Sequence, residues 1–221
     1  MRKKQRDPAA RERTKRYGLY ALGAVIVIGV AAALIAVFAM GGSSSGTSRS
    51  ELSVNFKGLP GISHGPAPWQ AEIDNLAQRL PLIGLKPLST EGSVVHIHQH
   101  LVIFIDGKPT TVPQDIGIND SQFLTELHTH DTTGVIHVES DTKRDYSLGE
   151  FFAVWGVYLS RKCIGGYCAK PGTPLKVYVD GQLHRGDPVT LVLKSHQVIA
   201  IVYGNPPKKI PSTYNFSARG L

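Results

Sequence analysis

Sulfur is scarce in this sequence. It contains two methionines and two cysteines, and both methionines, Met1 and Met40, lie within the first 40 residues. Soft Cu(I) sites usually take thioether or thiolate ligands, so the rest of the chain is poorly suited to such a site. The sequence also has no His-Glu-x-x-His pattern and no phosphate-binding loop. These absences argue against a Cu(I) carrier, a helical zinc protease and a nucleotide-binding enzyme.

Excess positive charge is confined to the first 16 residues. That segment, MRKKQRDPAARERTKR, holds eight Lys or Arg and two acidic residues, which leaves 16 basic and 15 acidic residues for the rest of the chain. The formal net charge of +7 therefore belongs mainly to a terminal segment. We expect no nucleic-acid partner, and the sequence indicates no particular protein partner.

An uncharged segment of 24 residues, Tyr17–Met40, follows the basic one. About 20 apolar helical residues cross a bilayer, so this segment predicts a transmembrane helix at 17–40. A cleaved signal peptide is the alternative, although its apolar region is usually about 7 to 15 residues long. Since basic residues favour the cytoplasmic side, residues 1–16 are expected to be a cytoplasmic tail. The sequence thus predicts a single-pass plasma-membrane protein with its C-terminal domain outside the cytoplasm.

A Gly/Ser-rich linker at 41–55 is expected to tether an extracytoplasmic domain at 56–221. We predict a mostly β (α+β) domain, a compact antiparallel sheet or sandwich with two short helices. Helical spacing of apolar residues predicts one helix at 68–80, and a capping box at Ser147 and Glu150 predicts another that runs to about Leu159. Alternation predicts strands at 93–106, 109–113, 123–130, 135–140, 174–180, 188–194 and 197–203, with Asp-Gly hairpin turns at 106–107 and 180–181.

The two cysteines, Cys163 and Cys168, are separated by four residues in the glycine-rich stretch CIGGYC. In an oxidising compartment such a pair is expected to close a small loop as a disulfide. A dithiol site for copper or redox exchange is the alternative, but the spacing differs from the Cys-x-x-Cys motif of redox proteins.

Histidines recur at every second position in VVHIHQHLVIFIDG, Val94–Gly107. Side chains alternate between the two faces of a strand, so His96, His98 and His100 are expected to share one face, spaced roughly 7 Å apart. Ile97, Leu101, Ile103 and Ile105 would then occupy the other face. One face of this strand therefore has the character of a core, and the other is a row of imidazoles.

A second histidine-rich stretch is LHTHDTTGVIHVES, Leu127–Ser140. If Asp131–Gly134 forms the turn of a hairpin, His128 faces His137 directly and His130 is their diagonal neighbour. The same alternation places Glu126 and Glu139 on the histidine face. Together the two stretches supply six of the nine histidines of the chain.

Imidazoles from neighbouring strands can meet at one transition-metal ion, and their chemistry favours Zn or Cu(II). We predict metal ligands first among His98, His100, His128 and His130, and then His96 and His137. Asp131, Glu126 and Glu139 are predicted to fix the ring tautomers from the second shell. The remaining histidines, His64, His184 and His196, are interpreted as surface or hydrogen-bonded residues.

The motifs PWQAEIDNLAQRL, VVHIHQHLVIFIDGK, VPQDIGI, LHTHDTTGVIHVES, YSLGEFFAVWG and VYGNPP together resemble an uncharacterised family of membrane-anchored or secreted bacterial and archaeal proteins with HxHxHL and LHTHD motifs. The resemblance covers about residues 65 to 207 and leaves out the predicted transmembrane segment. It implies a coherent folded unit and no particular reaction.

The sequence thus predicts a membrane-anchored protein that binds a divalent transition metal through strand-borne histidines and serves in metal handling. A zinc-dependent hydratase or hydrolase is the first alternative, because an open three-histidine site lowers the pKa of bound water to about 7. A pH-sensing or structural interaction domain without metal is the second.

Overall fold

The computed structural model describes residues 54–120 and 122–221. The predicted cytoplasmic tail, the predicted transmembrane helix and nearly all of the predicted linker lie outside these residues. Within the described part of the chain, no helix is long and apolar enough to cross a membrane.

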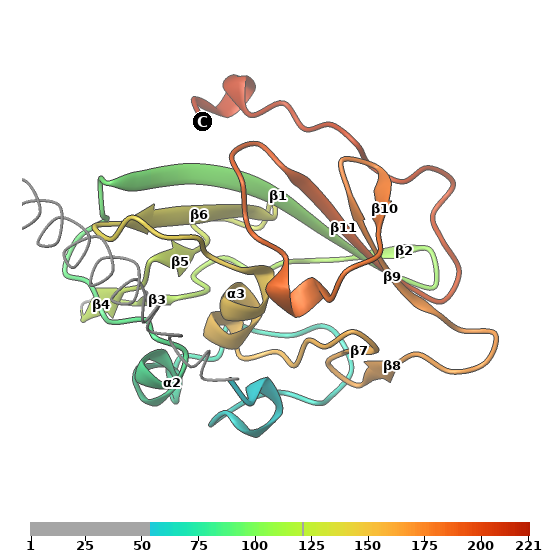
Figure 1. Ribbon diagram of the computed structural model, residues 1–221, viewed down its shortest axis with the longest axis horizontal. Coiled ribbons are helices and arrows are strands. Elements are labelled where there is room, and N and C mark those ends of the chain that lie inside the picture. The colour runs from blue at the N-terminus through green and yellow to red at the C-terminus, as the bar shows by residue number, and fades with distance from the viewer. Residues whose placement is uncertain (1–53, 121) are drawn as a thin grey trace, which may run out of the picture. The chain divides into compact units, whose positions relative to one another are not determined.

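A seven-stranded sheet organises the domain (Figure 1). Its central strand, β1 (Val95–Ile105), lies between β11 (Val198–Tyr203) and β6 (Val135–Ser140). The strand order is β10-β9-β11-β1-β6-β5, and β2 pairs with β1 off this path. The other strands of this sheet are β2 (Lys108–Thr110), β5 (Leu127–His128), β9 (Leu175–Val179) and β10 (Gln182–His184). Two small separate sheets are formed by β3 (Ile118–Asn119) with β4 (Phe123–Leu124), and by β7 (Cys163–Ile164) with β8 (Tyr167–Cys168).

The sheet is mixed, which corrects the prediction of an antiparallel sheet or sandwich. Strands β1 and β11 pair in parallel, with His100 opposite Val198 and Ile105 opposite Tyr203, whereas β1 and β6 are antiparallel. All six residues of β11 are buried, as is typical of a strand covered on both faces. Parallel partners need a long crossover, so no local turn in the sequence reveals this pairing.

Two of the predicted strands are replaced or interrupted where a side chain forms a hydrogen bond with the nearby backbone. The segment predicted at 188–194 begins as a 3-10 helix, Pro188–Thr190, because Asp187 Oδ1 accepts a hydrogen bond from Val189 N at 3.1 Å. The segment predicted at 123–130 is interrupted at Thr125 and Glu126, between β4 and β5. Both Asp-Gly hairpins are confirmed, since Asp106, Gly107, Asp180 and Gly181 all have positive φ angles.

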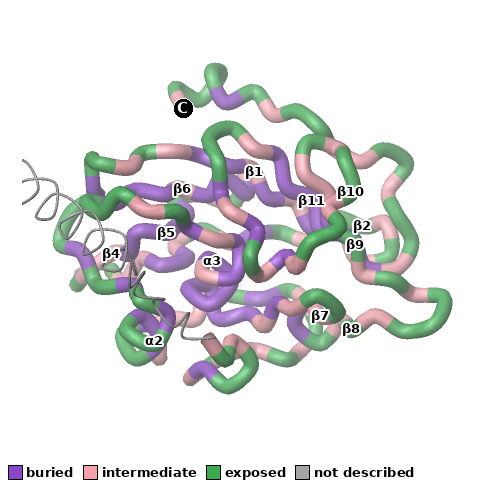
Figure 2. The backbone as a smooth tube through the Cα atoms, viewed as in Figure 1, coloured by how far each residue is buried: buried purple, intermediate pink, exposed green. Residues whose placement is uncertain are grey.

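Helix α3 (Leu148–Trp155) covers one face of the sheet and anchors the core (Figures 1 and 2). Its predicted capping box is present: Ser147 Oγ accepts from Glu150 N at 3.2 Å, and Glu150 Oε2 accepts from Ser147 N at 2.7 Å. The helix ends four residues earlier than predicted, because Gly156 takes a left-handed conformation with φ of 83°. Phe151, Phe152 and Trp155 join the sheet residues Leu101 and Ile136 in one buried cluster.

Helix α2 (Leu76–Leu82) begins eight residues later than predicted. The preceding segment binds the end of α3 instead of forming its own helical turns: Glu72 N donates to Trp155 O at 3.1 Å. The fully buried Arg79 guanidinium completes this contact by donating to the carbonyls of Ala153 at 2.8 Å and Val154 at 3.1 Å. Tertiary hydrogen bonds therefore override the helical spacing seen in the sequence.

Cys163 and Cys168 face each other across the short β7 and β8 pair. Their sulfur atoms lie at disulfide distance, 2.11 Å.

Candidate metal centre

A row of three histidines crosses the sheet on one face. The antiparallel register sets His98 of β1 opposite His137 of β6, and His137 opposite His128 of β5. The predicted hairpin register is thus confirmed, and β1 extends the row. Ring centroids are 4.6 Å apart for His98 and His137, and 5.3 Å apart for His128 and His137. The imidazoles of three strands therefore meet around His137.

A carboxylate lies beside this row. Glu139 of β6 is two residues from His137, on the same face, and directly opposite His96 of β1. Gln99 and Leu101 alternate with the histidines of β1, so they lie on the opposite face, where both are buried. The carboxylate of Glu139 lies near imidazoles of the neighbouring strand β1, of β5 and of its own strand β6.

Four of these side chains form what we call the first group: His128, His130, His137 and Glu139. Each offers one ligand atom, and these atoms all lie within 4.8 Å of one another. The Nε2 atoms of His128 and His130 are 3.1 Å apart. Two ligands of one tetrahedral ion with bonds near 2.1 Å would lie about 3.4 Å apart. The first group is therefore compatible with one bound metal ion.

His96, His98 and Glu139 form a second group by the same criterion, within 4.8 Å. The Nε2 atoms of His96 and His98 lie 3.5 Å and 3.8 Å from Glu139 Oε1. The two groups thus share one residue, Glu139.

Glu139 is a buried carboxylate whose ion-pair partners, within the residues described, are all imidazoles. Its side chain is 3% exposed, and Oε2 has no hydrogen-bond partner. Burial alone would raise the pKa of Glu139, but the hydrogen bond from His137 and the charges of His128, His137 and His96 lower it to about 2. A buried anion with an unpaired oxygen is costly unless a cation lies beside it.

Hydrogen bonds of the Nδ1 atoms orient the rings of His128 and His137, while His128 Nε2 shares a hydrogen bond with His130 Nε2 that a bound metal would replace. His128 Nδ1 donates to the carbonyl of Thr125 at 2.9 Å, and His137 Nδ1 donates to Glu139 Oε1 at 2.9 Å. Burial lowers the pKa of His128 to about 4, and burial together with the charges of His137 and His96 lowers that of His98 to about 4. Both rings are therefore neutral near pH 7, the form in which imidazole binds metals.

Sequence reasoning missed Glu91, whose carboxylate lies beside two histidines of the first group. Its Oε1 lies 3.3 Å from His130 Nε2 and 4.0 Å from His128 Nε2. It reaches them because the chain at Gly92 passes very close to the end of β6: a Cβ on Gly92 would lie 2.2 Å from the carbonyl carbon of Ser140. That glycine, one residue after Glu91 in the sequence, was the available signal.

Three predicted site residues lie in neither group. His100 Nε2 donates to the carbonyl of Thr133 at 3.0 Å. Asp131 accepts from Thr133 N at 2.8 Å and pairs with Arg219. Glu126 is buried, which raises its pKa, and its cationic neighbours are Arg144 and Lys86. Alternation fails at Glu126 because residues 125–126 are not part of a strand.

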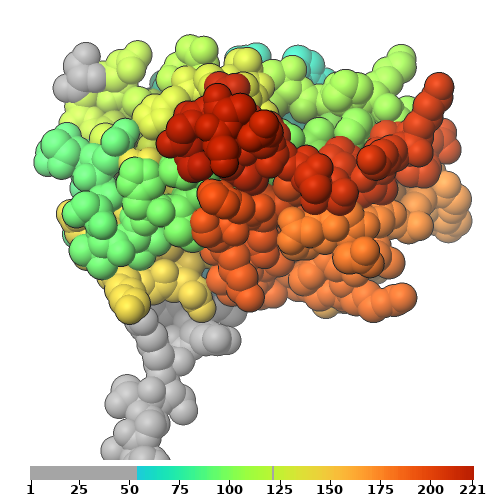
Figure 3. Space-filling view, turned by 90° about the horizontal axis from the view of Figure 1, so that it is seen from above, coloured from blue at the N-terminus to red at the C-terminus, as the bar shows by residue number. Residues whose placement is uncertain are grey.

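The C-terminal segment, red in Figure 3, contacts part of the histidine face through Tyr214. The ring of Tyr214 stacks on that of His100 with centroids 4.0 Å apart and an interplanar angle of 14°. His196 stacks on Phe216 in the same way at 4.6 Å. His64, His184 and His196 belong to neither ligand group.

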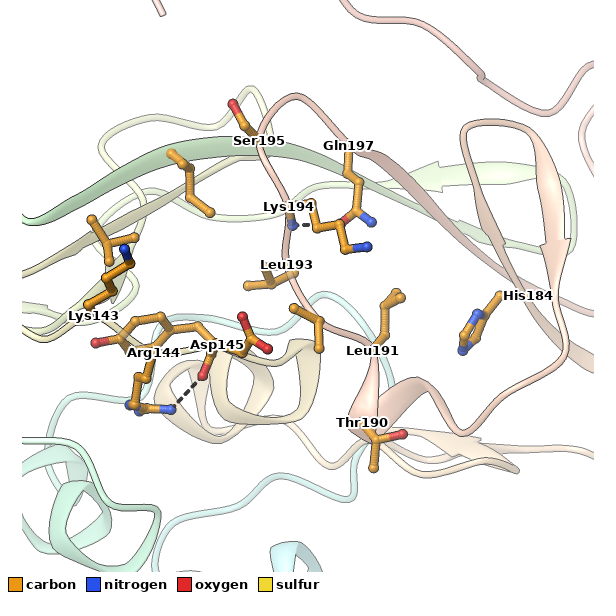
Figure 4. Close-up of a pocket in the computed structure, with 14 residues that line it drawn as sticks. Lys143, Arg144, Asp145, His184, Thr190, Leu191, Leu193, Lys194, Ser195 and Gln197 are labelled. Carbon is orange, nitrogen blue, oxygen red and sulfur yellow. Dashed lines mark hydrogen bonds between the residues drawn. The ribbon is translucent and has the colours of Figure 1, made fainter.

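A separate hollow of about 870 Å³ lies near the start of β1 (Figure 4). Val95 and Ile97 line it, at positions that alternate with His96 and His98. Arg144 and Lys194 lie at the same hollow, which shares no residue with either ligand group. The metal-compatible geometry thus lies apart from this hollow.

No protein-family model matches the chain, and no curated protein or solved structure is significantly similar to it. Its function therefore has to be argued from the site itself.

Proposed function

We propose that this protein binds one divalent transition metal ion, Zn(II) or Cu(II), at the first group. The observation that carries the proposal is the convergence of three imidazoles on a buried carboxylate whose Oε2 has no hydrogen-bond partner. A cation at this point would pair with Glu139 and bind the Nε2 atoms of His128 and His130 in place of the hydrogen bond between them. It would replace an unfavourable buried charge with a set of coordinate bonds.

The donor set decides between metals. Three nitrogens and one carboxylate oxygen suit Zn(II) and Cu(II), whereas Ca(II) and Mg(II) prefer oxygen ligands alone. The cysteines cannot alter this preference, because Cys163 and Cys168 lie at disulfide distance from each other and outside both groups.

The proposed role is metal handling outside the cytoplasm, in a domain anchored to the plasma membrane by residues 17–40. The uncharged segment and the basic residues before it support the anchor and its orientation. A paired Cys163 and Cys168 is typical of an oxidising compartment.

A zinc-dependent hydratase or hydrolase is the second candidate. The side chain of His130 is 45% exposed, so solvent can approach an ion at the first group. An ion with an open position would activate a water molecule. Hydration and esterase assays on the zinc-loaded protein test this candidate. A pH sensor is less well supported, since the lowered pKa values of His98 and His128, about 4, move their titration below the neutral range.

The proposal is tested by the zinc content and Zn(II) affinity of the full-length chain, purified in detergent without a histidine tag. We expect one tightly held ion per chain and loss of that ion in the double variant H128A/H137A. H64A is the matched control, because His64 lies outside both groups. Equal zinc in the double variant and the control, or no zinc in the unchanged protein, would refute the proposal.

A further inference from the structure

We infer that Glu139 bridges two metal ions, the second of which is held by His96 and His98. This inference rests on the proposed function, because the first ion of the pair is the one bound at the first group. It turns a single site into a dinuclear centre in which one buried carboxylate serves both ions.

The two oxygens of Glu139 face different histidines. Oε1 lies 3.5 Å from His96 Nε2 and 3.8 Å from His98 Nε2, while Oε2 lies 3.9 Å from His128 Nε2. Oε1 also accepts the hydrogen bond from His137, but a carboxylate oxygen has a second lone-pair direction. Each oxygen is therefore placed to bind its own ion.

The distances in the second group suit ligands of a shared ion better than hydrogen bonds. Separations of 3.5 Å and 3.8 Å exceed the usual range of an N–H···O bond, about 2.7 to 3.2 Å. Ligands of one tetrahedral ion would lie about 3.4 Å apart. The side chain of His98 is only 7% exposed, and its Nε2 atom is buried without any hydrogen-bond partner. An ion between these atoms would satisfy both His98 and Glu139.

The register of the sheet brings the two groups close enough for a pair of ions. His98 and His128 flank His137 on opposite sides, and the ring centroids of His98 and His137 are 4.6 Å apart. Ions in known two-metal sites are about 3.5 to 4 Å apart. Glu91, beside His130, adds a second carboxylate to balance the added charge.

The second position is the more open of the two. The side chain of His96 is 56% exposed, and the group supplies only three protein ligands. Solvent or a substrate oxygen would complete the coordination of the second ion. We therefore assign to the second position a divalent transition metal ion that exchanges more readily than the first.

Titration of the full-length, untagged protein with Cu(II), followed by electron paramagnetic resonance, tests the pair. We expect two equivalents to bind, the first with the spectrum of an isolated ion. The second should reduce the integrated signal well below two spins per chain, because ions bridged by a carboxylate couple magnetically. The variant H96A/H98A should bind one equivalent and keep the isolated spectrum.

Two further variants separate the bridge from a folding defect. E139Q removes the bridging charge and should abolish the coupling, whereas E126Q, a change to a neighbouring buried carboxyl outside both groups, should keep it. Loss of coupling in E126Q as well would overturn the assignment of the bridge to Glu139. If E139Q fails to fold, H96A/H98A decides the question alone.

The possible failures are distinguishable. One equivalent in both the unchanged protein and H96A/H98A would overturn the bridged pair and leave the proposed function standing. Two equivalents without coupling would also overturn it, since the second ion would then lie elsewhere. No binding at all would overturn both.

Discussion

The two ligand groups share Glu139 but differ in how the fold shields them. The first group is centred on β5 and β6, where the His128 side chain is fully buried and its tautomer is fixed by the carbonyl of Thr125. The second lies near the start of β1, where the side chain of His96 is 56% exposed and its ring, within the residues described, makes no hydrogen bond to the backbone. If each group holds an ion as proposed, burial and ring orientation, more than the number of histidines, should set the affinity of each position.

This difference leads to an order of binding. Ligand side chains that are already buried and oriented lose little conformational entropy when they bind an ion, whereas an exposed side chain must first be ordered. The first group should therefore fill first and hold its ion longest.

The largest expected effect comes from breaking the first group. H128A should weaken Zn(II) binding by roughly a hundredfold or more, because loss of an outer-shell partner alone costs about 10- to 100-fold. H96A should weaken binding of the first ion by no more than about tenfold, because His96 affects that ion only through its contact with Glu139. Calorimetric titration of both variants measures the ratio. Equal losses would remove the distinction between the groups.

An intermediate effect is expected from acid on the metal-free protein. The pKa of His98 and that of His128 are about 4 in the folded chain, below the ordinary value of 6.5. Between these values the unfolded chain binds more protons, so the free energy of unfolding falls as the pH is lowered from 6.5 to 4. Glu139, with a pKa of about 2, adds a loss of the same sign below pH 4.5.

Thermal unfolding of the chelator-treated protein measures this dependence. The melting temperature should fall steadily over that pH interval, and the slope should be shallower in H98Q/H128Q than in H64A. A melting temperature that is flat from pH 6.5 to 4 would show that these two rings are not shielded as the structure has them.

The smallest effect is expected at the edge of the histidine face. R219A removes the ion pair with Asp131, in which both side chains are well exposed, at 39% and 44%. Exposed pairs contribute about 0 to 1 kcal/mol, so stability should change by less than that, and Zn(II) affinity by less than about twofold. A large loss of affinity would mean that Asp131 belongs to the metal centre after all.

The sequence was most informative where a pattern is local. The turn at Asp131–Gly134 was enough to predict that His128 faces His137. The capping box predicted the start of α3 for the same reason. In each case the residues that determine the geometry lie within a few positions of one another.

Prediction was weakest where distant segments decide the structure. The parallel pairing of β1 with β11 joins strands that are far apart in the chain, and the late start of α2 depends on hydrogen bonds to α3. Glu139, predicted in the second shell, is a similar case: its position opposite His96 on the neighbouring strand places it within both groups. Glu91 could not be placed without the close approach at Gly92.

Anomalous X-ray diffraction from zinc-soaked crystals, recorded on both sides of the zinc absorption edge, tests the central claim most directly. We predict a strong peak within bonding distance, about 2.1 Å, of His128 Nε2, His130 Nε2 and a Glu139 oxygen. A map with no peak on the histidine face, or with peaks only at other histidines such as His64 or His184, would contradict the account.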